Sequence, residues 1–116
     1  MRSGYKDLIV WREAIQLNTL VFQMSGALPS RLRFVYADQM QRASLSIASN
    51  IAEGYGRSSR AELRRFCRIS FGSAMELETQ LCSLEALGSF PDPKLEHVQE
   101  KLNLVLRLLY GFIQSL

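Results

Sequence analysis

The chain has 116 residues, 47% of them hydrophobic and 22% charged, with a formal net charge of +3. This composition excludes a disordered protein, and the length suits one domain, residues 1–116, that buries its core without disulfides or metals. Charged residues interrupt the apolar runs near both ends, so neither a secretory signal nor a membrane span is recognisable. We therefore expect a cytoplasmic protein without a membrane partner.

Three clusters of helix-breaking residues, at 26–29, 54–59 and 88–93, divide the chain into four segments of helical length. The segments cover approximately residues 7–27, 32–55, 59–87 and 92–116. None of them alternates apolar and polar residues with a period of two, which argues against a sheet. Long amphipathic helices joined by short loops predict an all-α fold, an antiparallel up-down-up-down four-helix bundle.

The first two segments each carry an apolar stripe that follows the three- and four-residue steps of a helix face. Asp7 is the expected N-cap of the first segment. Its stripe consists of Val10, Ala14, Leu17, Val21, Met24 and Leu28. The second stripe consists of Tyr36, Met40, Ala43, Ile47 and Ile51. Gly54 and Gly56 are suited to end the second helix.

The third and fourth segments have distinct start signals. Ser59 and Glu62 fit a capping box at the start of the third helix, and Asp92 before Pro93 fits the N-cap of the fourth. The third stripe consists of Leu63, Cys67, Ser70, Ala74, Leu77, Leu81 and Leu84. The fourth consists of Leu95, Val98, Leu102, Val105, Leu109, Phe112 and Leu116.

Residues that support catalysis or metal binding are scarce. Cys67 and Cys82 lie fifteen positions apart in one predicted helix, about 22 Å along its axis, which excludes a disulfide between them. His97 is the single histidine, in an acidic stretch typical of exposed helix. We expect no catalytic residue, no metal and no cofactor.

Five arginines cluster around the start of the third helix: Arg57, Arg60, Arg64, Arg65 and Arg68. Three of them, Arg60, Arg64 and Arg68, are spaced by four residues and share one helix face. Guanidinium groups in such an array suit phosphate oxygens, and a helix N-terminus also favours anions. The cluster predicts contacts with the phosphates of RNA or DNA, to which Arg42 would add, with little reading of base sequence. The alternative is a solvated basic face paired with Glu53, with Glu62 or with acidic groups of a neighbouring subunit.

Charge is unevenly distributed along the chain, since residues 1–68 carry a balance of +6 and residues 69–116 a balance of −3. Such asymmetry is a hint of an anionic partner.

Asn50, Glu53 and Gly54 form a second group near the end of the second helix. Asn50 and Glu53 share a helix face and could bond each other or a partner. A structural or partner-binding role is favoured over catalysis.

Apolar residues outside the main stripes are in surplus. The fourth helix adds Leu104, Leu106 and Leu108, and the first adds a second face of Leu8, Trp11, Ile15 and Phe22. This surplus favours contacts between subunits, and a broad core-facing arc is the alternative.

Several linear patterns together resemble the bacterial four helix bundle protein family, whose members include proteins encoded by intervening sequences in 23S rRNA genes. The resemblance lies in residues 7–14 (DLIVWREA), 39–47 (QMQRASLSI), 50–54 (NIAEG), 65–66 (RF) and 72–81 (GSAMELETQL). It covers nearly the whole chain, and departs from the family pattern around residues 32–37, where this chain is more basic.

The resemblance implies a homo-oligomer, a pentameric ring in this family, often with a basic surface. Its relatives include the accessory variability protein of diversity-generating retroelements, which implies a reverse transcriptase as a further partner. Two hypotheses therefore stay open. The first is a non-enzymatic, homo-oligomeric nucleic-acid-binding protein, and the second an oligomeric scaffold for a protein such as a reverse transcriptase.

Overall fold

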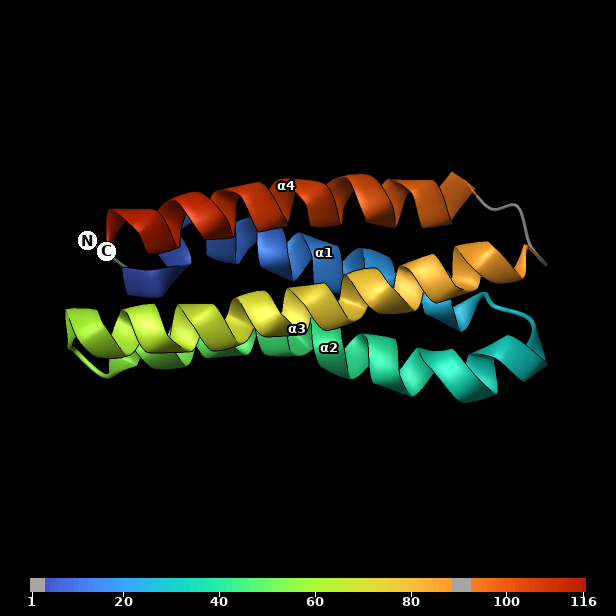
Figure 1. Cartoon of the computed structure of the whole chain (residues 1–116). Coiled ribbons are helices and arrows are strands. Elements are labelled where there is room, and N and C mark those ends of the chain that lie inside the picture. The colour runs from blue at the N-terminus through green and yellow to red at the C-terminus, as the bar shows by residue number, and fades with distance from the viewer. Residues whose placement is uncertain (1–3, 89–92) are drawn as a thin grey trace.

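The computed structural model describes residues 4–88 and 93–116, which form one short 3₁₀ helix and four α-helices. The 3₁₀ helix η1 covers Gly4–Asp7, and the α-helices are α1 (Ile9–Gly26), α2 (Ser30–Gly56), α3 (Arg60–Leu87) and α4 (Pro93–Ser115). Successive helices run in opposite directions, and α4 returns to pack on α1, which closes the bundle (Figure 1). The all-α up-down-up-down four-helix bundle predicted from the sequence is confirmed.

Two helix starts differ from the prediction. Asp7 is not the N-cap of α1: it ends η1, and Leu8 takes the N-cap position without a side-chain hydrogen bond. Asp7 is instead part of the 3₁₀ turn, in which the Leu8 amide donates a hydrogen bond to the Tyr5 carbonyl at 3.0 Å. The second helix begins at Ser30 rather than residue 32, directly after Pro29. The proposed N-cap Asp92 lies outside the described residues.

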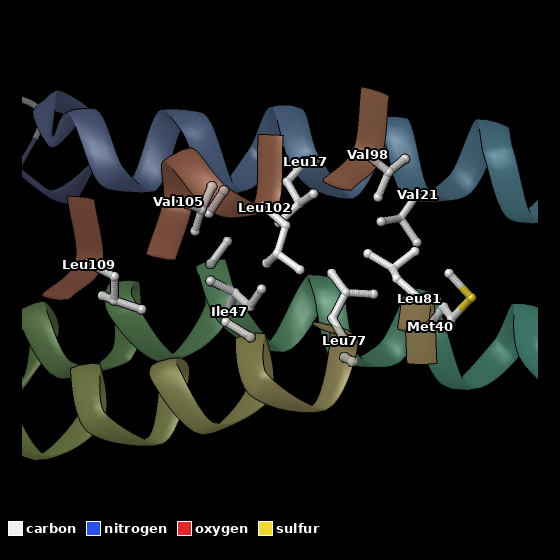
Figure 2. Packing of buried hydrophobic residues seen from close by; sticks show 14 of the residues in the cluster. Leu17, Val21, Met40, Ile47, Leu77, Leu81, Val98, Leu102, Val105 and Leu109 are labelled. Carbon is white, nitrogen blue, oxygen red and sulfur yellow. The ribbon is translucent and has the colours of Figure 1, made fainter. Parts of the chain in front are cut away.

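The four predicted stripes meet along the axis of the bundle (Figure 2). Every residue of the α1 stripe is buried, and Leu17, Val21 and Met24 are fully inaccessible to solvent. The prediction is wrong at the end of α4, where Ile113 is buried while Phe112 and Leu116 are half-buried. Steps of three and four from Leu109 reach both 112 and 113, and the tertiary packing selects Ile113.

Most of the apolar surplus is used inside the bundle. Leu8, Trp11 and Ile15 are half-buried and pack against the core, as do Leu106 and Leu108 of α4. Leu104 is half-buried, and Phe22 is exposed. The broad core-facing arc therefore accounts for most of these residues.

The two cysteines have different surroundings on α3. Cys67 is buried, and burial raises the pKa of its thiol to about 11, because the interior disfavours the thiolate. Cys82 is exposed, and neither forms a disulfide. Among the described helices, none is long and apolar enough to cross a membrane.

Candidate nucleic-acid interface

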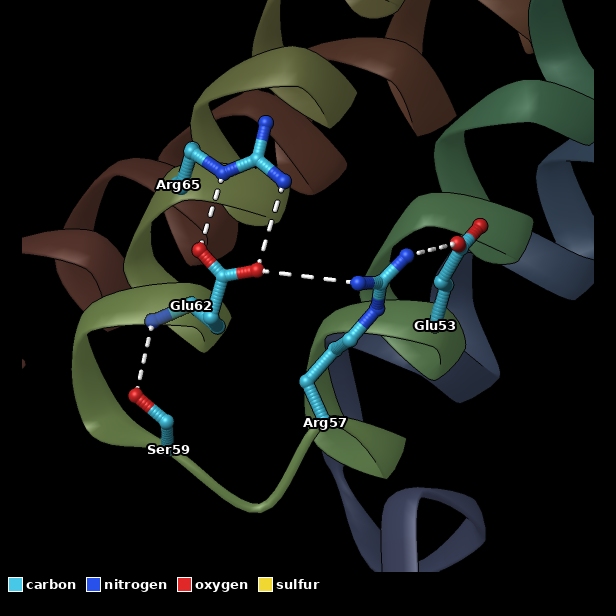
Figure 3. Close-up of polar contacts among 5 residues, drawn as sticks. All are labelled: Glu53, Arg57, Ser59, Glu62 and Arg65. Carbon is cyan, nitrogen blue, oxygen red and sulfur yellow. Dashed lines mark hydrogen bonds and ion pairs between the residues drawn. The ribbon is translucent and has the colours of Figure 1, made fainter.

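The turn between α2 and α3 places the end of one helix beside the start of the next. The Ser59 hydroxyl caps α3 by accepting a hydrogen bond from the Glu62 amide at 3.2 Å. This is one half of the predicted capping box. The other half differs, because the Glu62 carboxylate is engaged by arginine side chains (Figure 3).

Glu62 lies between two of the five clustered arginines. Its Oε2 and Oε1 accept hydrogen bonds from Nε and Nη2 of Arg65 at 3.0 and 3.3 Å, and Oε1 is 3.9 Å from Nη1 of Arg57. Arg57 also donates to Glu53 at 3.0 Å (Figure 3). The hydrogen bond with Arg65 lowers the pKa of Glu62 and raises that of Arg65, so both groups stay ionised. Two acids thus offset the charges of Arg57 and Arg65.

The aromatic ring of Phe66 contacts the same two guanidinium groups. Its ring is almost fully buried, and its centroid lies 5.0 Å from the Arg57 Cζ and 4.5 Å from the Arg65 Cζ. Both distances are within the range of cation–π attraction. These two arginines are therefore held in place by a ring and a carboxylate.

The other three arginines have a different environment. Arg60 donates to the backbone oxygens of Ser115 and Leu116 at 3.0 and 3.2 Å, at the negative end of the α4 dipole. Arg64 and Arg68 are exposed, and neither has a hydrogen bond or ion pair with any described residue. Their full charges are therefore available to a ligand.

These side chains line an open groove of about 560 Å³, which we call the arginine groove. Its lining consists of Arg60, Ala61, Arg64, Arg65, Arg68 and Leu116. No acidic residue is found among the described side chains that line it. The groove therefore offers an anion several guanidinium donors along one face of α3, with Arg57 beside it rather than in it.

Arg42 is not part of this groove. It pairs with Asp38 at 2.9 Å on the exposed side of α2. Ser46, one turn further along α2, is hydrogen-bonded to Ser73 of α3, so Arg42 lies level with a part of α3 beyond Arg68. Because α2 and α3 run antiparallel, Arg42 lies away from the arginines at the start of α3, although the sequence suggested that they act together.

Asn50, Glu53 and Gly54 lie near the end of α2. Asn50 donates to the carbonyl and the hydroxyl of Ser46, at 2.8 and 2.9 Å, and Glu53 pairs with Arg57 rather than with Asn50. Gly54 is buried, and a Cβ built on it would lie 2.7 Å from the Cβ of Phe66. The close approach of α2 and α3 at this point depends on Gly54, whereas Asn50 and Glu53 bond to residues of α2 and of the turn that follows it.

Sequence reasoning did not identify Phe66 or the backbone oxygens of residues 115–116 as parts of this site. Glu62 was recognised as a capping residue and as a possible ion-pair partner, and its spacing of three from Arg65 is the available signal. No pattern in the sequence points from Arg60 to the end of α4. In the described part of the chain, no three His, Cys, Asp or Glu side chains could together hold a metal ion.

A comparison with protein families gives a match over residues 6–111 to the model described as 23S rRNA-intervening sequence protein. The chain belongs to this family. The matched range includes all five clustered arginines together with Glu62 and Phe66. Residues 115 and 116, which contact Arg60, lie beyond it. The family membership that the sequence patterns suggested is confirmed.

The fold of this chain is also found in a solved structure. A crystal structure from Bacteroides thetaiotaomicron, titled as a protein with unknown function from the S23 ribosomal protein family, superposes with a TM-score of 0.83. Its sequence identity is 24%, and the match covers 94% of this chain and 98% of the other. No curated protein sequence matches the chain significantly.

Proposed function

We propose that this protein is a non-catalytic, homo-oligomeric protein that binds the phosphate backbone of RNA or DNA. The contacts are made by Arg60, Arg64 and Arg68 in the arginine groove. The observation that carries the proposal is the pair Arg64 and Arg68, one helical turn apart, exposed and without an acidic partner in the described chain. A guanidinium group binds phosphate oxygens through two parallel hydrogen bonds, which favours phosphate over an anion that cannot accept both bonds.

Self-association is supported by a second open groove, of about 520 Å³, between the start of α1 and the end of α4. Its lining is largely apolar and includes Ile9, which is exposed, together with Leu8, Leu108 and Phe112. Apolar surface of this kind on an isolated subunit favours burial against another subunit. The resemblance of the sequence to its family favours five copies of the 13.2 kDa chain.

The proposal is tested by a salt series with purified protein and short single- and double-stranded RNA and DNA of random sequence. Three phosphate contacts per subunit predict that log K falls with log salt at a slope of about −2 to −3 per bound subunit. Light scattering in the same buffers measures the mass of the free protein and of the complex. Absence of binding at low salt would overturn the proposal, and the nucleic acid bound most tightly identifies the preferred ligand.

Replacing Glu62 by glutamine is expected to strengthen nucleic-acid binding. The substitution removes the carboxylate charge that offsets Arg57 and Arg65, while the cap is retained because Ser59 bonds the backbone amide of residue 62. We expect an affinity gain of about tenfold and a salt slope steeper by about 1 to 2, since one or two further arginines reach phosphate. Titrations of both proteins in the same salt series measure the difference.

Glu76→Gln is the matched control for this variant, because Glu76 is an exposed acid of α3 beyond the arginine groove. The same change in net charge there should leave the salt slope unchanged. An equal gain in both variants would show that net charge alone, and not the release of Arg57 and Arg65, determines the affinity.

A further inference from the structure

A third exposed surface lies at the end of the bundle opposite the arginine groove, where α2 begins and α3 ends (Figure 1). An open groove of about 580 Å³ is found there, which we call the α2-start groove. Its lining consists of Pro29, Arg31, Leu32, Val35, Tyr36 and Leu87. Apart from Arg31, these side chains are mostly apolar. The surface therefore differs in chemistry from the arginine groove.

Large apolar side chains are unusually exposed around this groove. Val35 and Leu87 are each 53% exposed, and Phe34, which precedes Val35 on α2, is 91% exposed. The core of the bundle does not need them, because Met40 and Leu84 already fill the interior of this end. Contiguous apolar surface of this kind is typical of a site where another protein packs.

The shape of the groove is fixed before any partner binds. The Tyr36 hydroxyl and the Ser83 hydroxyl are 2.7 Å apart and hydrogen-bonded, which ties the start of α2 to the end of α3. Arg33 donates to the Leu28 carbonyl at 3.0 Å and to the Ser30 hydroxyl at 3.3 Å, which holds the α1–α2 turn. A partner would therefore meet a preformed surface, at a small entropic cost.

Positive charge lies at one edge of the apolar floor. Arg31 lines the groove and forms no hydrogen bond or ion pair within the described chain. No acidic residue lies in the first turn of α2, and the helix start has no side-chain cap, so the dipole adds to the charge of Arg31. The first acid of α2, Asp38, is already paired with Arg42. The groove thus combines an apolar floor with a positive charge at its α2 edge.

We propose that the α2-start groove docks an amphipathic helix of a partner protein, with apolar side chains on one face and carboxylates beside them. The apolar residues would be spaced at i, i+3, i+4 and i+7, so that they pack on Leu32, Val35 and Leu87. A carboxylate at the edge of that face would pair with Arg31. The aliphatic floor distinguishes this surface from a nucleic-acid site, which would present several arginines to successive phosphates as the arginine groove does.

The proposal is tested with two synthetic helical peptides. Both carry leucines at i, i+3, i+4 and i+7, and the positions next to this apolar face are glutamates in one peptide and lysines in the other. Calorimetry with the full chain, in the absence of nucleic acid, is expected to show at least tenfold tighter binding of the glutamate peptide. Chemical shifts of isotope-labelled protein should change at residues 29–36 and 84–87. Val35→Asp should weaken binding of the glutamate peptide at least tenfold, because it places a charge in the apolar floor.

Charge reversal makes the test specific to the groove. Arg31→Glu should invert the preference, so that the lysine peptide binds more tightly, whereas Arg42→Glu, an exposed change on the same helix, should preserve it. The proposal is overturned if both peptides bind equally and Arg31→Glu has no effect, or if the shifts change elsewhere. It is also overturned if Val35→Asp abolishes self-association, which would show that a second copy covers this surface, or if RNA displaces the glutamate peptide from it.

Discussion

The variant that replaces Arg60, Arg64 and Arg68 together by glutamate is expected to lose nucleic-acid affinity by at least about 100-fold at low salt. Each substitution removes one guanidinium from the arginine groove and adds a carboxylate that repels phosphate. Because all three side chains are exposed, the helices and the core should be retained. Titration with the preferred nucleic acid measures the loss, and circular dichroism and light scattering establish that helicity and mass are unchanged.

The control with the same change in net charge is the variant that replaces Arg31, Arg42 and Lys94 together by glutamate. All three are exposed and lie outside the arginine groove. A comparable loss in this variant would contradict the assignment of the site, because it would show that the overall charge of the protein decides the affinity. A double variant of Arg64 and Arg68 separates their effect from that of Arg60, which also holds the end of α4.

Replacing Gly54 by alanine is expected to lower the free energy of unfolding by about 1 to 2 kcal/mol, because overpacking so tight a contact costs about 2 to 3 kcal/mol and alanine returns about 1 kcal/mol in a helix. A Cβ there would lie 2.7 Å from the Phe66 Cβ and 3.2 Å from the Leu63 Cα. Neither atom belongs to the far end of a flexible side chain, so α2 and α3 must move apart. Urea unfolding measures the difference.

Two control variants, Gly72→Ala and Gly111→Ala, are expected to change the free energy of unfolding in the opposite direction. Both glycines lie inside helices, and a Cβ at either would meet no atom within 4 Å. These two variants should therefore be stabilised by about 0.5 to 1 kcal/mol through helix propensity alone. Stabilisation of the Gly54 variant by the same amount would show that the close contact between α2 and α3 yields at little cost.

The helices and their buried faces could be predicted because both depend on a periodicity that is local in the chain. Steps of three and four residues identified the stripe from Val10 to Met24 on α1 and Leu28 just beyond its end, and all six members of that stripe are buried. Helix ends were less accurate. Asp7 was assigned to a cap that Leu8 occupies, since a one-turn 3₁₀ helix depends on few residues and leaves little pattern.

The candidate site divides in the same way. The spacing of four between Arg60, Arg64 and Arg68 is local, and it correctly indicated a shared face of α3, which lines the arginine groove. Which arginines keep an unpaired charge was a matter of packing. Arg60 meets backbone oxygens 55 and 56 residues away, and Arg42 is carried beyond the groove by the antiparallel course of α2. Helix periodicity can be read from residues that are close together in the chain. The pairing of charges, and the close approach of α2 and α3 at Gly54, depend instead on which distant residues the bundle brings into contact.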